Sequence, residues 1–269
     1  MNDDDVSSHD VMVAVAIKYA GDWDKIFHAI KSRESYTPED VRKYCSQLTS
    51  KAITLADTDY PEEIRRHCHK PPFVIFYHGN ISLLNNPYRI MTVVGSREAQ
   101  PYAMKLTSSL CKKAAEDGFI IASGLARGID TAALSAAAPY PGRSIAILGN
   151  GVDYCYPSEN KELQQLIANN GLVCSEYPGK TPPKPNHFPF RNRLLAIVSQ
   201  TCLIGEVHQA SGTMTTVSFA LNYGRDIGVI PFRAEDHTMN NVLIKNGAAM
   251  IEDDQDLSLL LAHSTLRGA

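Results

Sequence analysis

The sequence has no long hydrophobic run. None of its apolar stretches approaches the roughly 20 residues that a helix needs to cross a bilayer. The chain also opens with acidic residues at positions 3–5, whereas a secretory signal opens with basic ones. We therefore expect a cytoplasmic protein without membrane insertion.

Cysteine pairs of the kind that bind zinc are absent. The six cysteines are scattered and form no Cys-x-x-Cys motif, so they predict neither a disulfide framework nor a zinc site. Residues 67–69, His-Cys-His, form one metal-like cluster. Adjacent side chains diverge in direction on both helices and strands, which favours ordinary surface residues over metal ligands. We expect no bound metal.

Catalytic and cofactor motifs are also absent. The Gly149–Gly151 turn has Tyr154 where a dinucleotide fingerprint needs a third glycine, which argues against NAD. Residues 179–181, Gly-Lys-Thr, resemble the end of a P-loop. Cys174 stands in place of its first glycine, however, and prolines 182–183 block the helix start. No nucleophile elbow or HExxH helix is present, so we expect neither a cofactor nor an enzyme.

The charge is unevenly distributed. The chain of 269 residues, 44% of them hydrophobic, can bury a sizeable core in one or two domains, and its net charge is −3. Residues 87–231 carry 13 basic and 10 acidic side chains, whereas the segments on either side are net acidic. The excess is small, so it makes a phosphate-binding surface only if its arginines gather in space.

The first 70 residues predict a helical module. Apolar residues fill positions 11–17 and recur at helical spacing in Trp23, Ile26 and Ile30, and Pro38 opens a further segment. A short strand is expected at 73–77, either leading into the main sheet or pairing with it.

From residue 88 onward, β-rich runs alternate with helical segments. This alternation predicts an α/β fold with a mostly parallel, doubly wound sheet over residues 71–252, followed by a short helical tail at 253–269. The expected strands are Ile90–Val94, Phe119–Ala122, Ser144–Leu148, Leu172–Cys174, Thr201–Gly205, Asp226–Ile230 and Ala248–Ile251.

Glycine- or serine-containing turns follow several of these strands. Ligands of such sheets bind beyond the carboxyl ends of the strands, and glycine turns and helix N-termini offer backbone N–H groups to an anion. We therefore expect a phosphate site where the turns converge. The turns are Gly95-Ser96-Arg97, the segment 123–130 with Gly124, Gly149-Asn150-Gly151, and Ser211-Gly212-Thr213.

Arginines add to this site. Arg97 and Arg127 lie on two of the turns, and Arg191-Asn192-Arg193 stands just ahead of the apolar run 194–198, at the expected mouth of a helix. Their guanidinium groups would make bidentate contacts with phosphate oxygens. The alternative is that some of them form structural ion pairs with acids of the same region, namely Asp130, Glu176 or Glu206.

Together, the motifs resemble the DNA-processing protein A family (DprA, also called Smf) over about residues 53–248. The matching blocks keep one order along the chain. They are 59–61, 76–80, 94–97, 123–130, 148–151 with 156–157 and Asn160, 175–178, 188–189 with 191–193, 211–213 with Thr216, 224–225, Pro231, and 243–244 with 247–248.

This resemblance implies an extended Rossmann-like domain that binds and protects single-stranded DNA and loads the RecA recombinase onto it during natural transformation. It also implies a homodimer without a catalytic role, formed near residues 197–203 or through the C-terminal region. The DNA and phosphate contacts that it implies are Gly95, Ser96, Arg97, Gly124, Arg127, Lys161, Arg191, Asn192, Arg193, Ser211, Gly212 and Thr213.

Two tyrosines offer faces on which bases can stack. Tyr154 and Tyr156 lie near the third turn, and stacking on aromatics is tolerant of base sequence. A half-buried packing role remains the alternative for each of them.

The chain departs from the family pattern at two positions. Leu134 stands where a histidine is common, and Phe232 follows Pro231 where glycine is frequent. We also expect no winged-helix module of the kind that some members append, because few residues follow the C-terminal helical segment in this sequence.

Two other functions use a similar pocket. Phosphoribohydrolases of the lysine-decarboxylase-like type need a glutamate where this chain has Thr216, and no carboxylate lies between Thr213 and Asp226, so the general acid/base residue is missing. A sensor of a small nucleotide is the second alternative, which competition between a mononucleotide and an oligonucleotide would separate from a DNA binder.

Overall fold

The protein is built around one mixed β-sheet. The structure is a computed structural model, and it describes residues 6–209 and 211–266. Its nine strands have the order β1-β2-β6-β5-β4-β3-β7-β8-β9. β1 and β2 run antiparallel to their neighbours, and all other pairs are parallel. The strands are β1 (Lys51–Thr54), β2 (Val74–Gly79), β3 (Ile90–Val94), β4 (Ile120–Ser123), β5 (Ser144–Ile147), β6 (Leu172–Ser175), β7 (Thr201–Ile204), β8 (Asp226–Val229) and β9 (Ala249–Met250).

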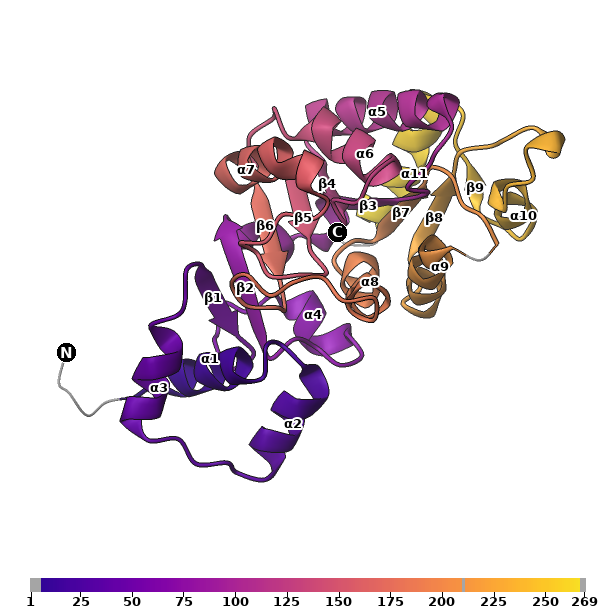
Figure 1. Cartoon of the computed structure of the whole chain (residues 1–269). Coiled ribbons are helices and arrows are strands. Elements are labelled where there is room, and N and C mark those ends of the chain that lie inside the picture. The colour runs from indigo at the N-terminus through magenta and orange to yellow at the C-terminus, as the bar shows by residue number, and fades with distance from the viewer. Residues whose placement is uncertain (1–5, 210, 267–269) are drawn as a thin grey trace.

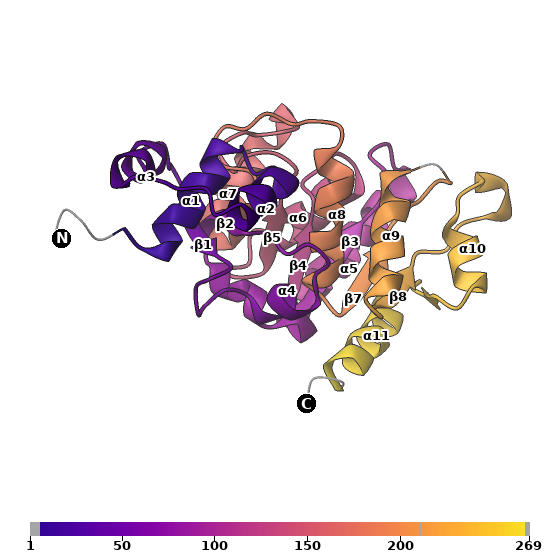
Figure 2. The same cartoon turned by 90° about the horizontal axis from the view of Figure 1, so that it is seen from below.

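Helices cover both faces of this sheet (Figures 1 and 2). α5, α6 and α7 lie on one face, and α4, α8 and α9 lie on the other. The α-helices are α1 (Ser8–Lys18), α2 (Trp23–Lys31), α3 (Pro38–Cys45), α4 (Glu62–His67), α5 (Pro101–Glu116), α6 (Ile129–Ala137), α7 (Lys161–Asn170), α8 (His187–Ile197), α9 (Gly212–Asn222), α10 (Asn240–Lys245) and α11 (Asp254–Leu266). The expected α/β fold with a mostly parallel, doubly wound sheet is thus confirmed.

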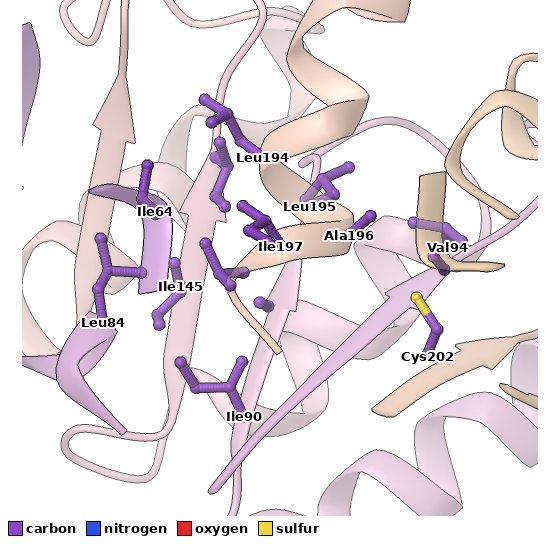
Figure 3. Close-up of a cluster of buried hydrophobic side chains, with 14 of the residues drawn as sticks. Ile64, Leu84, Ile90, Val94, Ile145, Leu194, Leu195, Ala196, Ile197 and Cys202 are labelled. Carbon is purple, nitrogen blue, oxygen red and sulfur yellow. The ribbon is translucent and has the colours of Figure 1, made fainter. Parts of the chain in front are cut away.

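The central strands are buried on both faces because each alternates its side chains between two cores. In β3, Met91 and Val93 pack with α5 and α6, whereas Ile90 and Val94 pack with α8. Figure 3 shows the α8 core, in which the apolar run Leu194–Ile197 lies over these strands. This packing fixes the start of α8 beside the carboxyl end of β3.

The N-terminal helices begin at the residues that their capping chemistry dictates. The hydroxyls of Ser7 and Thr37 each accept a hydrogen bond from the backbone N–H of an aspartate three residues later, at 3.1 Å. Pro38 occupies the first turn of α3, where its missing N–H costs no helical hydrogen bond. α1 and α2 then pack on β2 through a separate apolar cluster that includes Phe76.

β1 and α4 precede residue 70, and β1 pairs with β2 at the edge of the sheet. The sequence pattern predicts only helices in this part of the chain, so the presence of the strand β1 corrects that prediction. The domain divisions at residues 70 and 252 stay predictions, and residues 1–5 and 267–269, the outer ends of the first and last divisions, lie outside the described residues.

One of the two expected dimer surfaces is not accessible. Ile197, Val198 and Leu203 are almost completely buried within the protomer, since α8 and β7 form part of its core. The C-terminal region remains as the expected surface. Separately, none of the described helices is long and apolar enough to cross a membrane.

Candidate functional site

A cavity of about 680 Å³ opens at the carboxyl end of β3. From β3 the chain winds outward through β4, β5 and β6, and it then returns to place β7 on the other side of β3. The cavity therefore lies where the strand order reverses, the usual ligand position in doubly wound sheets. Its walls are the loop 95–98, the segment 183–192 of the α8 start, and the α9 start at 211–216.

Arg191 is the buried cation of this cavity. It is 5% exposed. Its Nη1 donates to the carbonyl oxygens of Gly124, at 3.2 Å, and of Ile147, and its Nε donates to Oδ1 of Asn192 at 3.2 Å. Within residues 6–209 and 211–266, its Nη2 has no hydrogen-bond acceptor. A buried guanidinium is therefore fixed through two of its nitrogens while the third lacks a partner.

Asp130 balances this cation without contacting it as an ion pair. The carboxylate is 5% exposed and accepts hydrogen bonds from the backbone N–H groups of Gly124 and Ala126, at 3.2 and 3.3 Å. Burial raises the pKa of Asp130, and the positive charge of Arg191 opposes this shift. Burial also lowers the pKa of Arg191 to about 10, and Asp130 partly offsets this effect. Arg191 therefore stays charged at neutral pH.

Gly124 makes this arrangement possible. A Cβ at this position would lie 2.6 Å from Nη2 of Arg191 and 2.8 Å from Oδ2 of Asp130. Both distances are below normal contact, so only glycine leaves the arginine in place. Gly95 is needed for a different reason, because its Cβ would lie 2.4 Å from the side chain of Ile129. At both positions the backbone lies too close to a neighbouring side chain for any residue but glycine.

Arg97 is the exposed cation at the cavity mouth. It lies on the loop after β3, and its guanidinium carbon lies 5.5 Å from the ring centre of Phe188. No carboxylate of the described residues pairs with it. Tyr156 also packs against Phe188, with ring centres 5.8 Å apart. Arginine and aromatic faces thus stand together at the cavity mouth.

The start of α9 closes the opposite wall. Asn192 ties it to α8, since its Nδ2 donates to the carbonyl oxygen of Gly212 at 3.1 Å. Ser211 precedes the helix, and its Oγ is buried without a partner among the described atoms. Thr213 and Thr216 complete this wall. The first N–H groups of α9 therefore face a cavity that also holds two arginines, an arrangement suited to an anion.

Arg193 does not line the cavity. Its Nη1 and Nη2 donate to the two carboxylate oxygens of Glu176, at 2.8 and 2.7 Å, and it also donates to the carbonyl oxygens of Lys70 and Phe190. Both members of the pair are nearly fully buried. Arg193 therefore forms a structural ion pair with Glu176, which was the alternative to a phosphate contact. Its role as a phosphate contact stays a prediction, and this geometry does not support it.

The prediction that the segment 191–193 stands ahead of a helix is wrong. α8 already begins at His187, with Pro189 in its first turn, so the arginines lie inside the helix. Residues two positions apart in a helix point in nearly opposite directions. For this reason Arg191 faces the cavity while Arg193 faces Glu176.

The other predicted contacts are spread more widely. Ser96 lines the cavity, and Arg127 lies beside it in a small adjoining hollow. Lys161 lines a different hollow, together with His78 and Asp153. Tyr154 is exposed but does not line the cavity.

The Gly149 turn also stays outside the cavity. A Cβ on Gly149 would lie 2.8 Å from the Phe188 ring, so this turn supports the aromatic wall rather than the ligand space. Phe188 and Thr216 line the cavity but are not among the site residues predicted from the sequence. Helical spacing offers a signal for Phe188, which lies three residues before Arg191 and therefore on the same face of α8.

No group of His, Cys, Asp and Glu side chains in the described part of the chain could hold a metal ion. In the 67–69 cluster the buried Cys68 lies between two exposed histidines. The two departures from the family pattern also lie away from the cavity. Leu134 is buried between α6 and the sheet, and Phe232 packs edge-on against Tyr102.

The doubly wound sheet, with a cavity where its strand order reverses, defines a Rossmann-like α/β protein. Within that class, the sequence profile of DNA recombination-mediator protein A matches residues 51–262. The chain belongs to this family, which confirms the resemblance seen in the motifs. Proteins of this family act in DNA processing and recombination.

Named relatives agree with this membership. The DNA processing protein DprA of Streptococcus pneumoniae is 37% identical over 209 residues, which cover 77% of this chain and 72% of the relative. The protein Smf of Synechocystis is 34% identical over 233 residues, which cover 85% of this chain but only 58% of the relative.

Solved structures show the same fold. The X-ray structure of S. pneumoniae DprA aligns with a TM-score of 0.73 and 29% identity over 96% of this chain and 94% of that one. DNA processing protein A of Helicobacter pylori, described for its single-stranded DNA binding mode, aligns with a TM-score of 0.68 and 30% identity over 79% of this chain and 97% of that one.

Proposed function

We propose that this protein binds single-stranded DNA through phosphates seated in the cavity at the end of β3. The observation that carries the proposal is the state of Arg191. Its guanidinium is buried and held by backbone carbonyls, yet Nη2 has no acceptor among the described residues. A buried cation is costly unless it is paired and hydrogen-bonded. Asp130 already balances the charge of Arg191, and a phosphate oxygen in the cavity would supply the missing acceptor.

The remaining walls suit a nucleotide strand. Arg97 supplies a second cation without a carboxylate partner in the described part of the chain, and the start of α9 supplies backbone N–H groups. Phe188 and Tyr156 offer ring faces at the mouth, where an unpaired base can stack. No base-reading arrangement accompanies them, so we propose binding with little sequence preference. The single-stranded DNA binding mode described for the H. pylori relative supports this assignment.

The decisive experiment is fluorescence anisotropy with a labelled oligothymidylate, a duplex of equal length and two salt concentrations. We expect the single strand to bind and the duplex to compete poorly. The cavity lies at the carboxyl end of β3, where it can accept unpaired, separated bases but not a rigid double helix. Affinity should fall with added salt as counterions are released.

Absence of binding to either DNA would refute the proposal. Displacement of the strand by thymidine monophosphate at equal concentration would instead identify a nucleotide sensor, the alternative function for the same cavity.

We further propose that the bound strand is protected and passed to the RecA recombinase, as in natural transformation, without a catalytic step by this protein. Membership of a recombination-mediator family supports this role. Its measurement is ATP hydrolysis by RecA on DNA coated with single-strand-binding protein, which this protein should accelerate. No acceleration from a preparation that binds DNA would refute the loading role alone.

A homodimer through the C-terminal region forms the last part of the proposal. Exposed apolar side chains gather in this part of the sequence, among them Val242, Met250 and Leu259. Burying such side chains in an interface would remove apolar surface from water. Multi-angle light scattering measures the oligomeric state directly, and a monomer at all concentrations would contradict the dimer.

A further inference from the structure

Arg127 already has an anionic partner beside the cavity. It lies in the turn after β4, and together with Arg97, Tyr156 and Phe188 it lines the small hollow that adjoins the main cavity. Its Nε forms an ion pair with Oε1 of Glu159, and both side chains are about half exposed or more. A carboxylate and a phosphate both accept hydrogen bonds from the guanidinium fork. The acid therefore occupies a position that a DNA phosphate would otherwise take.

The pairing is built into the fold. Glu159 belongs to the 3₁₀ turn Ser158–Asn160, which leads into α7. The next residue, Asn160, is buried, and its Nδ2 donates to the carbonyl oxygen of Leu125 at 3.0 Å and to Oγ1 of Thr131 at 2.8 Å. These two bonds fasten the turn of the acid to the turn of the arginine. The backbone segments that carry Glu159 and Arg127 are thus held side by side by buried hydrogen bonds, while the two side chains themselves remain partly exposed.

We propose that Glu159 sets the affinity for single-stranded DNA by competing with a phosphate for Arg127, an inference that rests on the proposed function of the cavity. Arg97 and Arg191 take phosphates without displacing a protein anion from an ion pair. A phosphate that takes the Nε edge of Arg127 must displace Glu159, and one that approaches the other nitrogens of the guanidinium meets the repulsion of the adjacent carboxylate. Part of the binding free energy of each strand is then spent on this exchange.

The test compares two variants that change the net charge equally. Glu159→Gln removes the competing carboxylate, whereas Glu162→Gln removes an exposed carboxylate on α7 that forms no ion pair with a described residue. At low salt, Glu159→Gln should tighten binding of an oligothymidylate by about two- to fivefold, the range over which exposed ion pairs act. Glu162→Gln should produce a smaller change. The difference between them should shrink at high salt, because the ion pair is then screened.

A third variant identifies the partner of the acid. In an Arg127→Ala background, Glu159→Gln should have no more effect than Glu162→Gln. Equal effects of the two glutamine variants in the otherwise unchanged protein would overturn the inference while leaving DNA binding intact. Failure of the unchanged protein to bind DNA would overturn both the inference and the proposed function.

Discussion

Replacing Arg97 with alanine is expected to weaken binding of a short oligothymidylate by about tenfold or more. Hydrogen bonds to charged groups contribute about 1.5–3 kcal/mol each, and a loss of about 1.4 kcal/mol is a tenfold change in affinity. Arg97 is exposed and pairs with no carboxylate of the described residues. Its removal therefore takes away a ligand contact without breaking an ion pair of the fold, and the melting temperature should stay nearly unchanged.

Lys31→Ala provides the matched control. Lys31 is an exposed cation in the last turn of α2, distant in the fold from the cavity walls, and its removal changes the net charge by the same amount. Anisotropy titrations should show a small effect for Lys31→Ala and a large one for Arg97→Ala. The salt dependence of binding should also become shallower in Arg97→Ala, because one fewer phosphate is neutralised. Equal losses in both variants would mean that only the overall charge matters.

Much of this site is predictable from the sequence because local rules determine it. Short β-rich runs give the strands, and in a parallel sheet their carboxyl ends share one edge. The turns that carry Gly95 and Gly124 must therefore lie near each other. The need for glycine at Gly124 also follows a local pattern, although its physical reason appears only with Arg191 packed against it.

The partners of the arginines depend on contacts distant in the sequence. Glu176 lies 17 residues from Arg193 along the chain, and no local pattern pairs the two. Their meeting depends on how α8 is rotated over the sheet, which its apolar residues settle through packing with several strands. The same rotation directs Arg191 into the cavity. Once α8 is known to begin at His187, helical spacing predicts that Arg191 and Arg193 lie on opposite faces of the helix. It does not predict which of the two faces lines the cavity.

Arg193→Met should destabilise the protein more than any cavity variant discussed here. The substitution leaves the carboxylate of Glu176 buried and unpaired, and breaking a buried ion pair in this way costs about 3–5 kcal/mol. For a protein of 269 residues this corresponds to a fall in the melting temperature of roughly 6–20 °C, at about 2–4 °C for each kcal/mol. Thermal and urea unfolding measure this change. The double variant Arg193→Met with Glu176→Leu removes both charges, and it should recover most of the lost stability.

DNA binding by the same variants decides the role of Arg193. If Arg193 only stabilises the fold, the folded fraction of the double variant should bind oligothymidylate with an affinity within about twofold of that of the unchanged protein. Substitutions that do not touch the ligand are expected to change the free energy by less than about 0.5 kcal/mol. Arg193 has no place in the cavity wall, whereas Arg191, two positions earlier, has one. A double variant that melts normally but loses DNA binding would show instead that Arg193 reaches the strand, and α8 would then have to rotate or unwind when DNA binds.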